Sequence, residues 1–380
     1  MKNLDIIKII RWLMLVSVLF FRIEVKAQAN VYVNPDTTIL SGQSMITVDF
    51  MISNVTNLHS YKVSLIFDNS IISFQSIAQG PFLSTGGSTV FFTTPSTIID
   101  SINAEAALLG PYSVNGSGKL FSITFNVLSA GISSINIVDV QLRDLANQSI
   151  PVSWTSGNLI VPISVNTKFF LEGAYSTGSL TTTLNSLGYL PLTQPYSNSP
   201  WNYLGTESVP SGFFVTHSDI VDWVLIELRT DTSSNTVVER RAGFLLNSGV
   251  VVNINGSSPL YFEQFKGNYY LVLYHRNHIS ILSSNPLYLD YVSSQYDFTD
   301  SQSKALGVNP MVNFGDGNFG AYTGDTDANG TVSAADRSNA WNQRNIIGYF
   351  GADVDLNGTV NAADRSMIWN NRNITTHLPN

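Results

Sequence analysis

The sequence predicts a mainly β, secreted chain of several domains that ends in a small α-helical module. Its 380 residues are enough for two or three domains. Most of the chain alternates short Val, Ile and Phe runs with clusters of Ser, Thr, Asn and Gly, which is typical of β-rich extracellular proteins. From residue 323 onward the texture changes, because this stretch contains an internal repeat of a loop followed by a helix start.

The first 29 residues have the features of a secretory signal peptide. A positively charged start precedes an apolar run at residues 12–21, and a small-x-small cleavage pattern follows at residues 27–29. A membrane-spanning helix needs about 20 apolar residues, so this run is too short to be one. We therefore predict a signal peptide over residues 1–29, a secreted, extracellular protein, and no membrane span after its removal.

The absence of cysteine and the negative charge narrow the function classes. A secreted chain without disulfides must be stabilised by its core or by bound metal. The formal net charge is −8, so nothing in the composition points to nucleic-acid binding.

Residues 30–161 alternate apolar and polar side chains with a period of two. Three runs show it: Ile46, Val48, Phe50 and Ile52; Tyr61, Val63, Leu65 and Phe67; and Phe121, Ile123, Phe125 and Val127. Strands of this kind have one dry face and one solvated face, which favours a β-sandwich. Between Ile137 and Val138 the phase of the alternation slips by one residue, which indicates a β-bulge.

Residues 162–322 are richer in aromatic residues, and we interpret them as a second β-rich domain whose role the sequence leaves open. Strand-like runs occur at residues 223–228, 242–246 and 269–274, separated by Gly, Pro and Ser clusters. Aromatic residues that either stack on sugar rings or fill the core are Trp201, Tyr203 and Trp223.

This second region contains polar residues but no recognisable catalytic motif. Asp222 and Glu227 are five residues apart in a predicted strand, so their side chains should point to opposite faces. His275 and His278 should also diverge if their strand continues, which argues against a shared metal ion. Because no hydrolase, phosphate-loop or cysteine-nucleophile motif is present, we expect no enzyme activity and no catalytic residues.

The tail contains a repeat with a period of 28 residues. GDTDANGTVSAADRS at residues 324–338 returns as ADVDLNGTVNAADRS at residues 352–366, and WNQRNI at 341–346 returns as WNNRNI at 369–374. Residues 323–380 contain six acidic residues, and all six occupy the first, third or twelfth position of one of two D-x-D-x-N-G loops. A merely solvated acidic turn would scatter its charge.

Each copy has the spacing of a calcium-binding loop, which supplies six to eight oxygens from positions one, three, five, seven, nine and twelve. The predicted ligands of two Ca2+ ions are Asp325, Asp327, Asn329, Thr331 by its backbone, Ser333 and Asp336 in the first loop, and Asp353, Asp355, Asn357, Thr359 by its backbone, Asn361 and Asp364 in the second. Crowded carboxylates repel each other unless a cation neutralises them, so we expect the tail to need calcium to fold. The alternative is a pair of Asx-turn loops without metal.

The arrangement of the tail resembles the dockerin type I module of cellulosome-type systems. Position twelve is Asp where a standard EF-hand has Glu, no helix-forming stretch precedes the first loop, and the unit is duplicated. The resemblance covers about residues 324–374, within a tail domain of residues 323–375. Arg337 and Arg365 stand where the family often has Leu, which leaves the metal sites intact and the identity of the partner open.

The dockerin resemblance implies that the tail binds a cohesin-like protein. It places the partner-contacting residues at Ala334, Ala335, Trp341, Asn342, Ile346, Ala362, Ala363, Trp369, Asn370 and Ile374. For both tryptophans the alternative is burial between two helices, because a module this small needs its largest side chains in the core. Since the two copies match at these offsets, we expect two near-equivalent binding faces.

Residues 30–161 also carry an ordered series of landmarks. They include VYVNP at 31–35, GQ at 42–43, GPFL at 80–83, GSGKL at 116–120 and GNLIV at 157–161. Their order and spacing resemble a cohesin domain, a nine-stranded jelly-roll β-sandwich that binds dockerins and shares its architecture with some carbohydrate-binding modules. The resemblance implies dockerin-bearing proteins as partners of the first domain, with polysaccharide as the alternative ligand.

Two functions remain open at this stage. In the first, the protein is a non-catalytic adaptor that joins polysaccharide-degrading complexes through cohesin–dockerin contacts. In the second, it is a carbohydrate-binding or hydrolase-associated secreted protein that its tail attaches to such an assembly.

Overall fold

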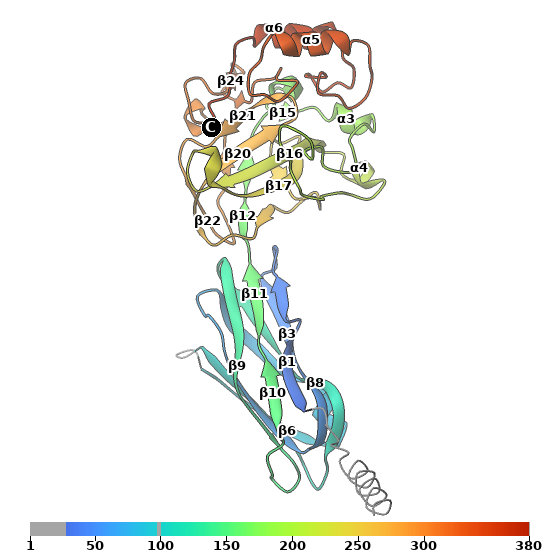
Figure 1. The fold of residues 1–380 in the computed structure, drawn as a ribbon, viewed down its shortest axis with the longest axis vertical. Helices are drawn as coiled ribbons and strands as arrows, with labels where there is room; N and C mark the ends of the chain where they lie inside the picture. The colour runs from blue at the N-terminus through green and yellow to red at the C-terminus, as the bar shows by residue number, and fades with distance from the viewer. Residues whose placement is uncertain (1–27, 97–99, 380) are drawn as a thin grey trace, which may run out of the picture.

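The computed structural model describes residues 28–96 and 100–379, which form an elongated molecule with two bodies (Figure 1). The lower body is a β-sandwich, and the upper body combines a second β unit with the helical tail. The predicted signal peptide lies almost entirely outside the described residues. Within the described ranges, no helix has the length and apolar character needed to cross a membrane.

The sandwich contains eleven strands in two sheets. The strands are β1 (Ala29–Asn34), β2 (Thr37–Ile39), β3 (Met45–Leu58), β4 (Ser60–Ile66), β5 (Ile72–Gln79), β6 (Thr89–Ser96), β7 (Ser101–Leu108), β8 (Val114–Val127), β9 (Gly131–Arg143), β10 (Val152–Thr155) and β11 (Gly157–Val161). One sheet has the order β10-β1-β3-β8-β5 and the other β2-β11-β9-β4-β7-β6. A short helix, α2 (Pro81–Ser84), lies against β8.

The predicted alternation is confirmed, because one face of each long strand is buried between the two sheets. In β3 the side chains of Val48 and Phe50 are buried, and Phe50 stacks on Phe121 of β8 with ring centroids 4.4 Å apart. The predicted bulge is also present. The pairing of β4 with β9 shifts where β9 contains the extra residue Val138, which is exposed.

The eleven strands derive from nine chain segments, as in the jelly roll that the resemblance implies. Only Pro35 and Asp36 separate β1 from β2, and only Ser156 separates β10 from β11. Each of these two segments crosses from one sheet to the other, and β1 pairs with β10 while β2 pairs with β11, both in parallel. Proline cannot donate to a ladder, so Pro35 interrupts the first crossing segment.

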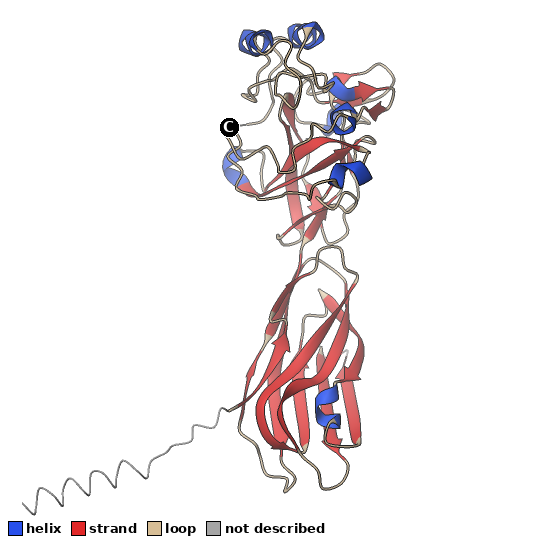
Figure 2. Ribbon diagram, turned by 90° about the vertical axis from the view of Figure 1, so that its right-hand side faces the viewer, coloured by secondary structure: helices blue, strands red, loops and turns tan. Residues whose placement is uncertain are grey.

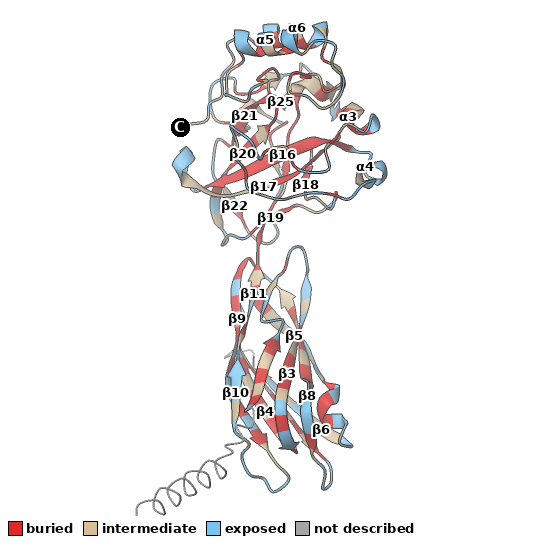
Figure 3. Cartoon of the chain, turned by 45° about the vertical axis from the view of Figure 1, so that its right-hand side comes forward, coloured by how far each residue is buried: buried red, intermediate tan, exposed pale blue. Residues whose placement is uncertain are grey.

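The second β unit is built on one large sheet with the order β18-β17-β16-β20-β21, in which β22 also pairs with β20, and its other strands form small two-stranded sheets. Its strands are β12 (Ile163–Val165), β13 (Thr167–Lys168), β14 (Tyr175–Ser176), β15 (Ser179–Leu180), β16 (Ile220–Arg229), β17 (Val237–Leu246), β18 (Val251–Val252), β19 (Leu260–Phe262), β20 (Gly267–His275), β21 (His278–Leu282), β22 (Leu287–Leu289), β23 (Tyr296–Asp297), β24 (Val312–Asn313) and β25 (Phe319–Gly320). Short helices are α3 (Thr183–Ser186), α4 (Phe213–Thr216), and the 3-10 turns η1 (Glu172–Ala174), η2 (Ser234–Thr236) and η3 (Gln302–Lys304). The central strand β16 is buried along its whole length (Figure 3).

A short polar contact joins the sandwich to the second unit. Only Pro162 separates β11 from β12. The Asp290 carboxylate accepts hydrogen bonds from the Ala130 backbone N–H at 2.6 Å and from the Ser129 hydroxyl, which Lys266 also contacts. The two bodies therefore meet through specific bonds and not through the chain alone.

The tail forms two helices, α5 (Ala334–Asn342) and α6 (Ala362–Asn370), which lie side by side at the free end of the molecule (Figure 2). The two repeats pair reciprocally. Val332 in the first loop exchanges backbone hydrogen bonds with Asn373 and Ile374 after α6, and Val360 does the same with Asn345 and Ile346 after α5. These positions are one repeat period apart, so the pairing gives the tail a pseudo-twofold axis.

The tail and the second unit share their cores. Ile279 of β21 is buried in the small core of the tail, and Leu356 of the second loop is buried in the core of the second unit. The last residues also return to this unit, since the Thr376 hydroxyl donates to the Ser280 carbonyl at 2.9 Å. The tail is thus part of the upper body and is not a separate module on a linker.

Candidate metal centres and docking faces

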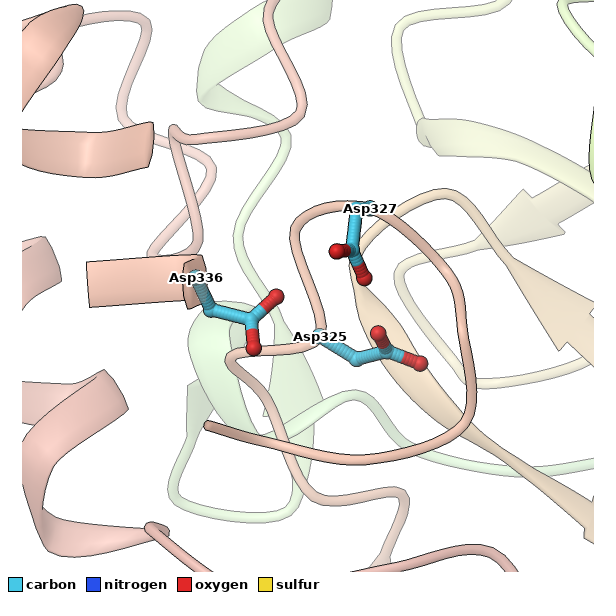
Figure 4. Close-up of side chains that lie close together, drawn as sticks. All are labelled: Asp325, Asp327 and Asp336. Carbon is cyan, nitrogen blue, oxygen red and sulfur yellow. The ribbon is translucent and has the colours of Figure 1, made fainter. Parts of the chain in front are cut away.

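The first loop brings three carboxylates together. Asp325 and Asp327 project from the loop and Asp336 from the start of α5, and each contributes an oxygen within 4.8 Å of the others (Figure 4). Backbone amides orient these oxygens: the N–H groups of Asn329 and Gly330 donate to the two oxygens of Asp325 at 3.0 and 2.9 Å. Gly330 has a φ of 86°, which permits the sharp turn.

The second loop repeats this arrangement with Asp353, Asp355 and Asp364. The N–H groups of Asn357 and Gly358 donate to the two oxygens of Asp353 at 3.1 and 2.9 Å. The two loops therefore present the same carboxylate triad on the same backbone.

The ninth and twelfth residues of each loop together form the capping box of the helix that follows. The Ser333 hydroxyl accepts from the Ala335 N–H, and Asp336 accepts from the Ser333 N–H at 2.8 Å, which forms a capping box. Asn361 and Asp364 form the same box at α6. The side chains at position nine, Ser333 and Asn361, thus cap the helices. A bond from either of them to an ion would be additional to the capping bond.

The other predicted ligands lie at the rim of each triad. The side-chain carbonyl of Asn329 accepts from the Thr331 N–H at 2.9 Å, and that of Asn357 accepts from the Thr359 N–H at 2.8 Å. These bonds close each loop around its three carboxylates and hold positions five and seven next to them.

In each triad, burial and the repulsion between neighbouring carboxylates disfavour the ionised form of the aspartates. Burial, together with the charges of Asp336 and Asp327, raises the pKa of Asp325 to about 7. Burial and the charges of Asp364 and Asp353 raise the pKa of Asp355 to about 7 as well. A divalent cation would remove this repulsion, and oxygen-only donor sets of this kind suit calcium.

The outer surfaces of α5 and α6 are exposed, and the predicted partner residues divide into two groups on them. The four alanines and the two asparagines, Asn342 and Asn370, are exposed. Trp341 and Trp369 are 53% and 49% exposed, so burial between the helices is excluded for both. Ile346 and Ile374 lie differently: both are partly buried against the tail core and are less available to a partner.

A buried polar cluster lies where the second unit meets the second loop. Asp222 has no exposed surface, and it accepts hydrogen bonds from Arg276 at 3.1 Å and from the Tyr349 hydroxyl at 2.7 Å. Burial raises the pKa of Asp222, but the charge of Arg276 and the bonds from His275 and Tyr349 outweigh burial and lower it. Arg276 also donates to the carbonyl of Phe350 and lies over the ring of Tyr349.

His275 and His278 do not diverge as the continuing-strand pattern predicts, because the strand turns back at Arg276 and Asn277. β20 ends at His275, β21 begins at His278, and the two Nδ1 atoms lie 3.0 Å apart. The Gly173 N–H donates to His278 Nε2 at 3.1 Å, so the proton of His278 is on Nδ1. His275 Nδ1 must then accept, and His275 Nε2 donates to Asp222.

This arrangement requires both histidine rings to be neutral. Burial, with the charges of His275 and Arg276, lowers the pKa of His278 well below its ordinary value. Burial also lowers the pKa of His275, although Asp222 opposes the effect. The neighbouring Asn277 side chain donates to the backbone carbonyls of Gly351 at 3.1 Å and of Asp353 at 2.6 Å. Asn277 therefore ties the turn between the two histidines to the loop that holds Asp353.

Glu227, Trp223 and Tyr203 have structural roles, and Trp201 is partly buried with its ring packed edge-on against Tyr196. Glu227 is buried and binds Arg229 and Arg240 at 2.6 and 2.5 Å. Trp223 is fully buried and Tyr203 nearly so, which excludes both as sugar-stacking platforms. These residues fill the core or neutralise one another.

The sandwich presents one open sheet face with a groove of about 320 Å³. A row of cross-strand neighbours crosses it from β6 to β9, formed by Phe92, Glu105, Lys62 and Gln141. Phe92 is 63% exposed, and Lys62 pairs with Glu105 at 3.4 Å. The groove thus has an exposed aromatic ring beside a Lys–Glu ion pair.

Comparison with known proteins detects a likeness at the level of solved structures. No known family profile and no curated protein matches the chain. A non-cellulosomal cohesin from the archaeon Archaeoglobus fulgidus matches with 18% identity and a TM-score of 0.31, covering 35% of this chain and 91% of that one. A type II cohesin domain from the cellulosome of Acetivibrio cellulolyticus matches with 15% identity and a TM-score of 0.32, covering 35% and 95%.

A structure of a type I cohesin–dockerin complex from Clostridium thermocellum matches with 14% identity and a TM-score of 0.31, covering 35% of this chain and 92% of that one. Identities and TM-scores at this level transfer neither a partner nor an activity. The mainly β architecture of this protein is established by its own strands and sheets.

Proposed function

We propose that the protein is a non-catalytic extracellular adaptor that joins polysaccharide-degrading complexes, with a dockerin-type tail and a cohesin-type first domain. The observation that carries the proposal is the duplicated carboxylate triad, in which two loops one repeat period apart orient three carboxylates each by the same backbone bonds. Two Ca2+ ions fit this chemistry. Aspartates at positions one, three and twelve would hold each ion, with the oxygens of positions five, seven and nine beside them.

Calcium would act here as a structural ion. It would neutralise three carboxylates per loop, of which the first and the last are buried, and it would tie each helix start to its loop, because Asp336 and Asp364 belong to both. The exposed outer faces of α5 and α6 would then be held in a fixed relation for a cohesin-like partner. The first domain is proposed to receive a dockerin-bearing protein on the open face that carries Phe92.

The calcium sites are tested by titration calorimetry of the full chain after removal of metal. We expect two calcium ions per chain. Asp336→Asn should leave one ion, as should Asp364→Asn, and a double variant should bind none. Asp300→Asn is the control, because that exposed carboxylate pairs with Lys304 outside both loops. Unchanged stoichiometry in the double variant would contradict the calcium assignment.

The adaptor role is tested by capture experiments with the full chain carrying both loop substitutions, so that the tail does not contribute. Capture of dockerin-bearing proteins that is lost in Phe92→Ser supports the adaptor. Retention on insoluble cellulose, xylan or chitin without capture of any dockerin-bearing protein would favour the carbohydrate-binding alternative. Release of reducing sugar by the purified chain, lost in Asp222→Asn or Glu227→Gln, would contradict the absence of catalysis.

A further inference from the structure

The acidic and basic side chains of the tail are segregated: the acidic ones belong to the two loops and helix starts, and the arginines to the helices and the residues just after them. All six acidic residues of residues 323–380 belong to the two loops, and the chain has no lysine in this stretch. Its basic side chains, histidine aside, are four arginines on or just after the helices: Arg337, Arg344, Arg365 and Arg372. The exposed helix face is therefore positive, although the formal charge of the whole protein is −8.

The arginines are held over the two exposed tryptophans in a reciprocal pattern. Arg337 of α5 lies 4.8 Å from the ring centre of Trp369 on α6, and Arg365 of α6 lies 5.0 Å from that of Trp341 on α5. Arg344 and Arg372 lie 4.8 and 4.5 Å from Trp341 and Trp369, each on its own side. Each ring thus has two guanidiniums over it, which limits the flexibility of long side chains.

Both rings and three of the four arginines, Arg337, Arg365 and Arg372, line a groove of about 800 Å³ between the two helices. No Asp or Glu is among its lining residues, so nothing in the groove neutralises the guanidiniums. A purely structural role accounts for only part of the set. Arg344 and Arg372 donate to the carbonyls of Trp341 and Trp369 at 2.9 Å and so cap the helices, and Arg365 donates to the Asn361 carbonyl at 3.2 Å. Arg337 is exposed, and its described contact is the ring of Trp369.

We propose that this groove binds a carboxylate-rich protein surface, with the arginines as its anion-binding groups and the tryptophans as the platforms that orient them. The assignment rests on the proposed function, because it names the chemistry of the partner of the tail. Arginine forks match carboxylate geometry in pairs, and pre-oriented forks lose less entropy on binding. A sugar ring is a poorer occupant, since guanidiniums already lie over both tryptophan rings.

The test measures fluorescence anisotropy of a labelled poly-L-glutamate peptide of about 20 residues, with the full calcium-loaded chain at low and moderate salt. We expect Arg337→Gln/Arg365→Gln to weaken binding about 10-fold or more, as for loss of charge-assisted hydrogen bonds. Lys119→Gln/Lys304→Gln removes the same charge elsewhere and should leave binding within about twofold. Arg337→Lys/Arg365→Lys keeps the charge and checks that loss of binding is not loss of the fold.

Equal binding by the Arg337→Gln/Arg365→Gln variant would overturn the proposal, as would tighter, arginine-dependent binding of polygalacturonate or double-stranded DNA than of poly-L-glutamate. A panel of purified cohesin domains separates this proposal from the adaptor role. If a cohesin domain binds the tail and both arginines are dispensable, the acidic-surface proposal fails and the adaptor stands. If poly-L-glutamate binds through the arginines and no cohesin domain binds, the adaptor fails and this proposal stands.

Discussion

The two calcium-type loops have the same acidic residues but different neighbours. In the first loop Asp327 is exposed, and the second and fourth positions are Thr326 and Ala328, which are partly exposed. In the second loop these two positions are Val354 and Leu356, with exposed fractions of 0% and 1%. The second loop packs against the β unit through these two side chains, whereas the corresponding side chains of the first loop are partly exposed to solvent.

The comparison shows which loop positions the two copies share and which positions differ between them. The acidic positions are identical, because both loops must place three carboxylates in the same way, whereas position nine is Ser333 in the first loop and Asn361 in the second. Among the positions between them, the second and the fourth have diverged, since one copy also serves as an interface. The Asn277 side chain donates to the carbonyls of Gly351 and Asp353 in the second copy, whereas its backbone carbonyl accepts one bond, from the Gly324 N–H at 3.0 Å, in the first copy. The β unit therefore supports the second loop more extensively than the first.

The largest expected effect comes from removing the apolar anchor of the second loop. Leu356→Ala should lower the free energy of unfolding by about 2–5 kcal/mol, because it opens a cavity in the shared core. The equivalent change in the first loop, Ala328→Gly, should alter the free energy of unfolding by less than about 0.5 kcal/mol, because Ala328 has no such core contact. Ala328 and Leu356 both have a positive φ, so the two substitutions are made on the same backbone conformation. Urea unfolding of both variants gives the comparison. Similar losses would mean that the two loops are anchored alike.

Calcium removal should affect the first loop more than the second. We expect the amides of Thr326 and Gly330 to lose about 100-fold in hydrogen-exchange protection with chelator, equivalent to about 3 kcal/mol. Val354 and Gly358 make the same bonds in buried surroundings and should lose less than about 10-fold. Exchange followed residue by residue decides this, and equal loss at both pairs would refute the asymmetry.

Acid should loosen the contact between the second loop and the β unit. Because burial lowers the pKa of both His275 and His278, the unfolded chain takes up protons at a higher pH than the folded one. Their contribution is therefore complete above the unfolded value of 6.5 and is lost as the pH falls below it, by about 2 kcal/mol at pH 5 for each ring that stays neutral.

The measurement compares variants, so that effects of the loop carboxylates cancel. His278→Gln should reduce the fall in unfolding free energy between pH 7 and pH 5 by about 2 kcal/mol. His377→Gln, at an exposed ring, should leave the fall unchanged. An identical pH dependence in wild type and His278→Gln would show that the neutral pair does not hold the interface.

The smallest expected effect tests whether the outer helix faces stay equivalent although the loops beneath them do not. Asn342→Ala and Asn370→Ala should each cost less than about 0.5 kcal/mol in affinity for a cohesin-type partner, because the other copy still serves. The double variant should cost far more than the sum. If either single change abolishes binding while the calcium-bound fold survives, the β unit has made the faces inequivalent.

Much of the molecule follows from short-range patterns. The alternation around Phe50 and Phe121 predicts the sandwich, and the phase slip at Val138 predicts the bulge. The positions of Asp325, Asp336 and their copies predict which carboxylates meet, because one tight loop and one helix turn bring them together. The signal-peptide prediction lies outside the described residues, and the calcium and partner assignments remain proposals.

Other features escape such patterns, although the sequence contained a signal for one of them. The apolar residues Val354 and Leu356, where the first copy has Thr326 and Ala328, mark the loop that is buried. No local pattern shows that Asp222, Arg276 and Tyr349 meet, since they come from three distant segments.

By itself, the sequence determined the strand faces, the carboxylate cluster of each loop and the helix starts, because these depend on residues within a few positions of each other. The tertiary structure alone decided that the chain turns between His275 and His278, that Trp341 and Trp369 stay exposed, and that Asp222 meets Arg276 and Tyr349. Each of these depends on which distant segment covers a surface. Burial and charge pairing across such contacts are settled only when the whole chain is folded.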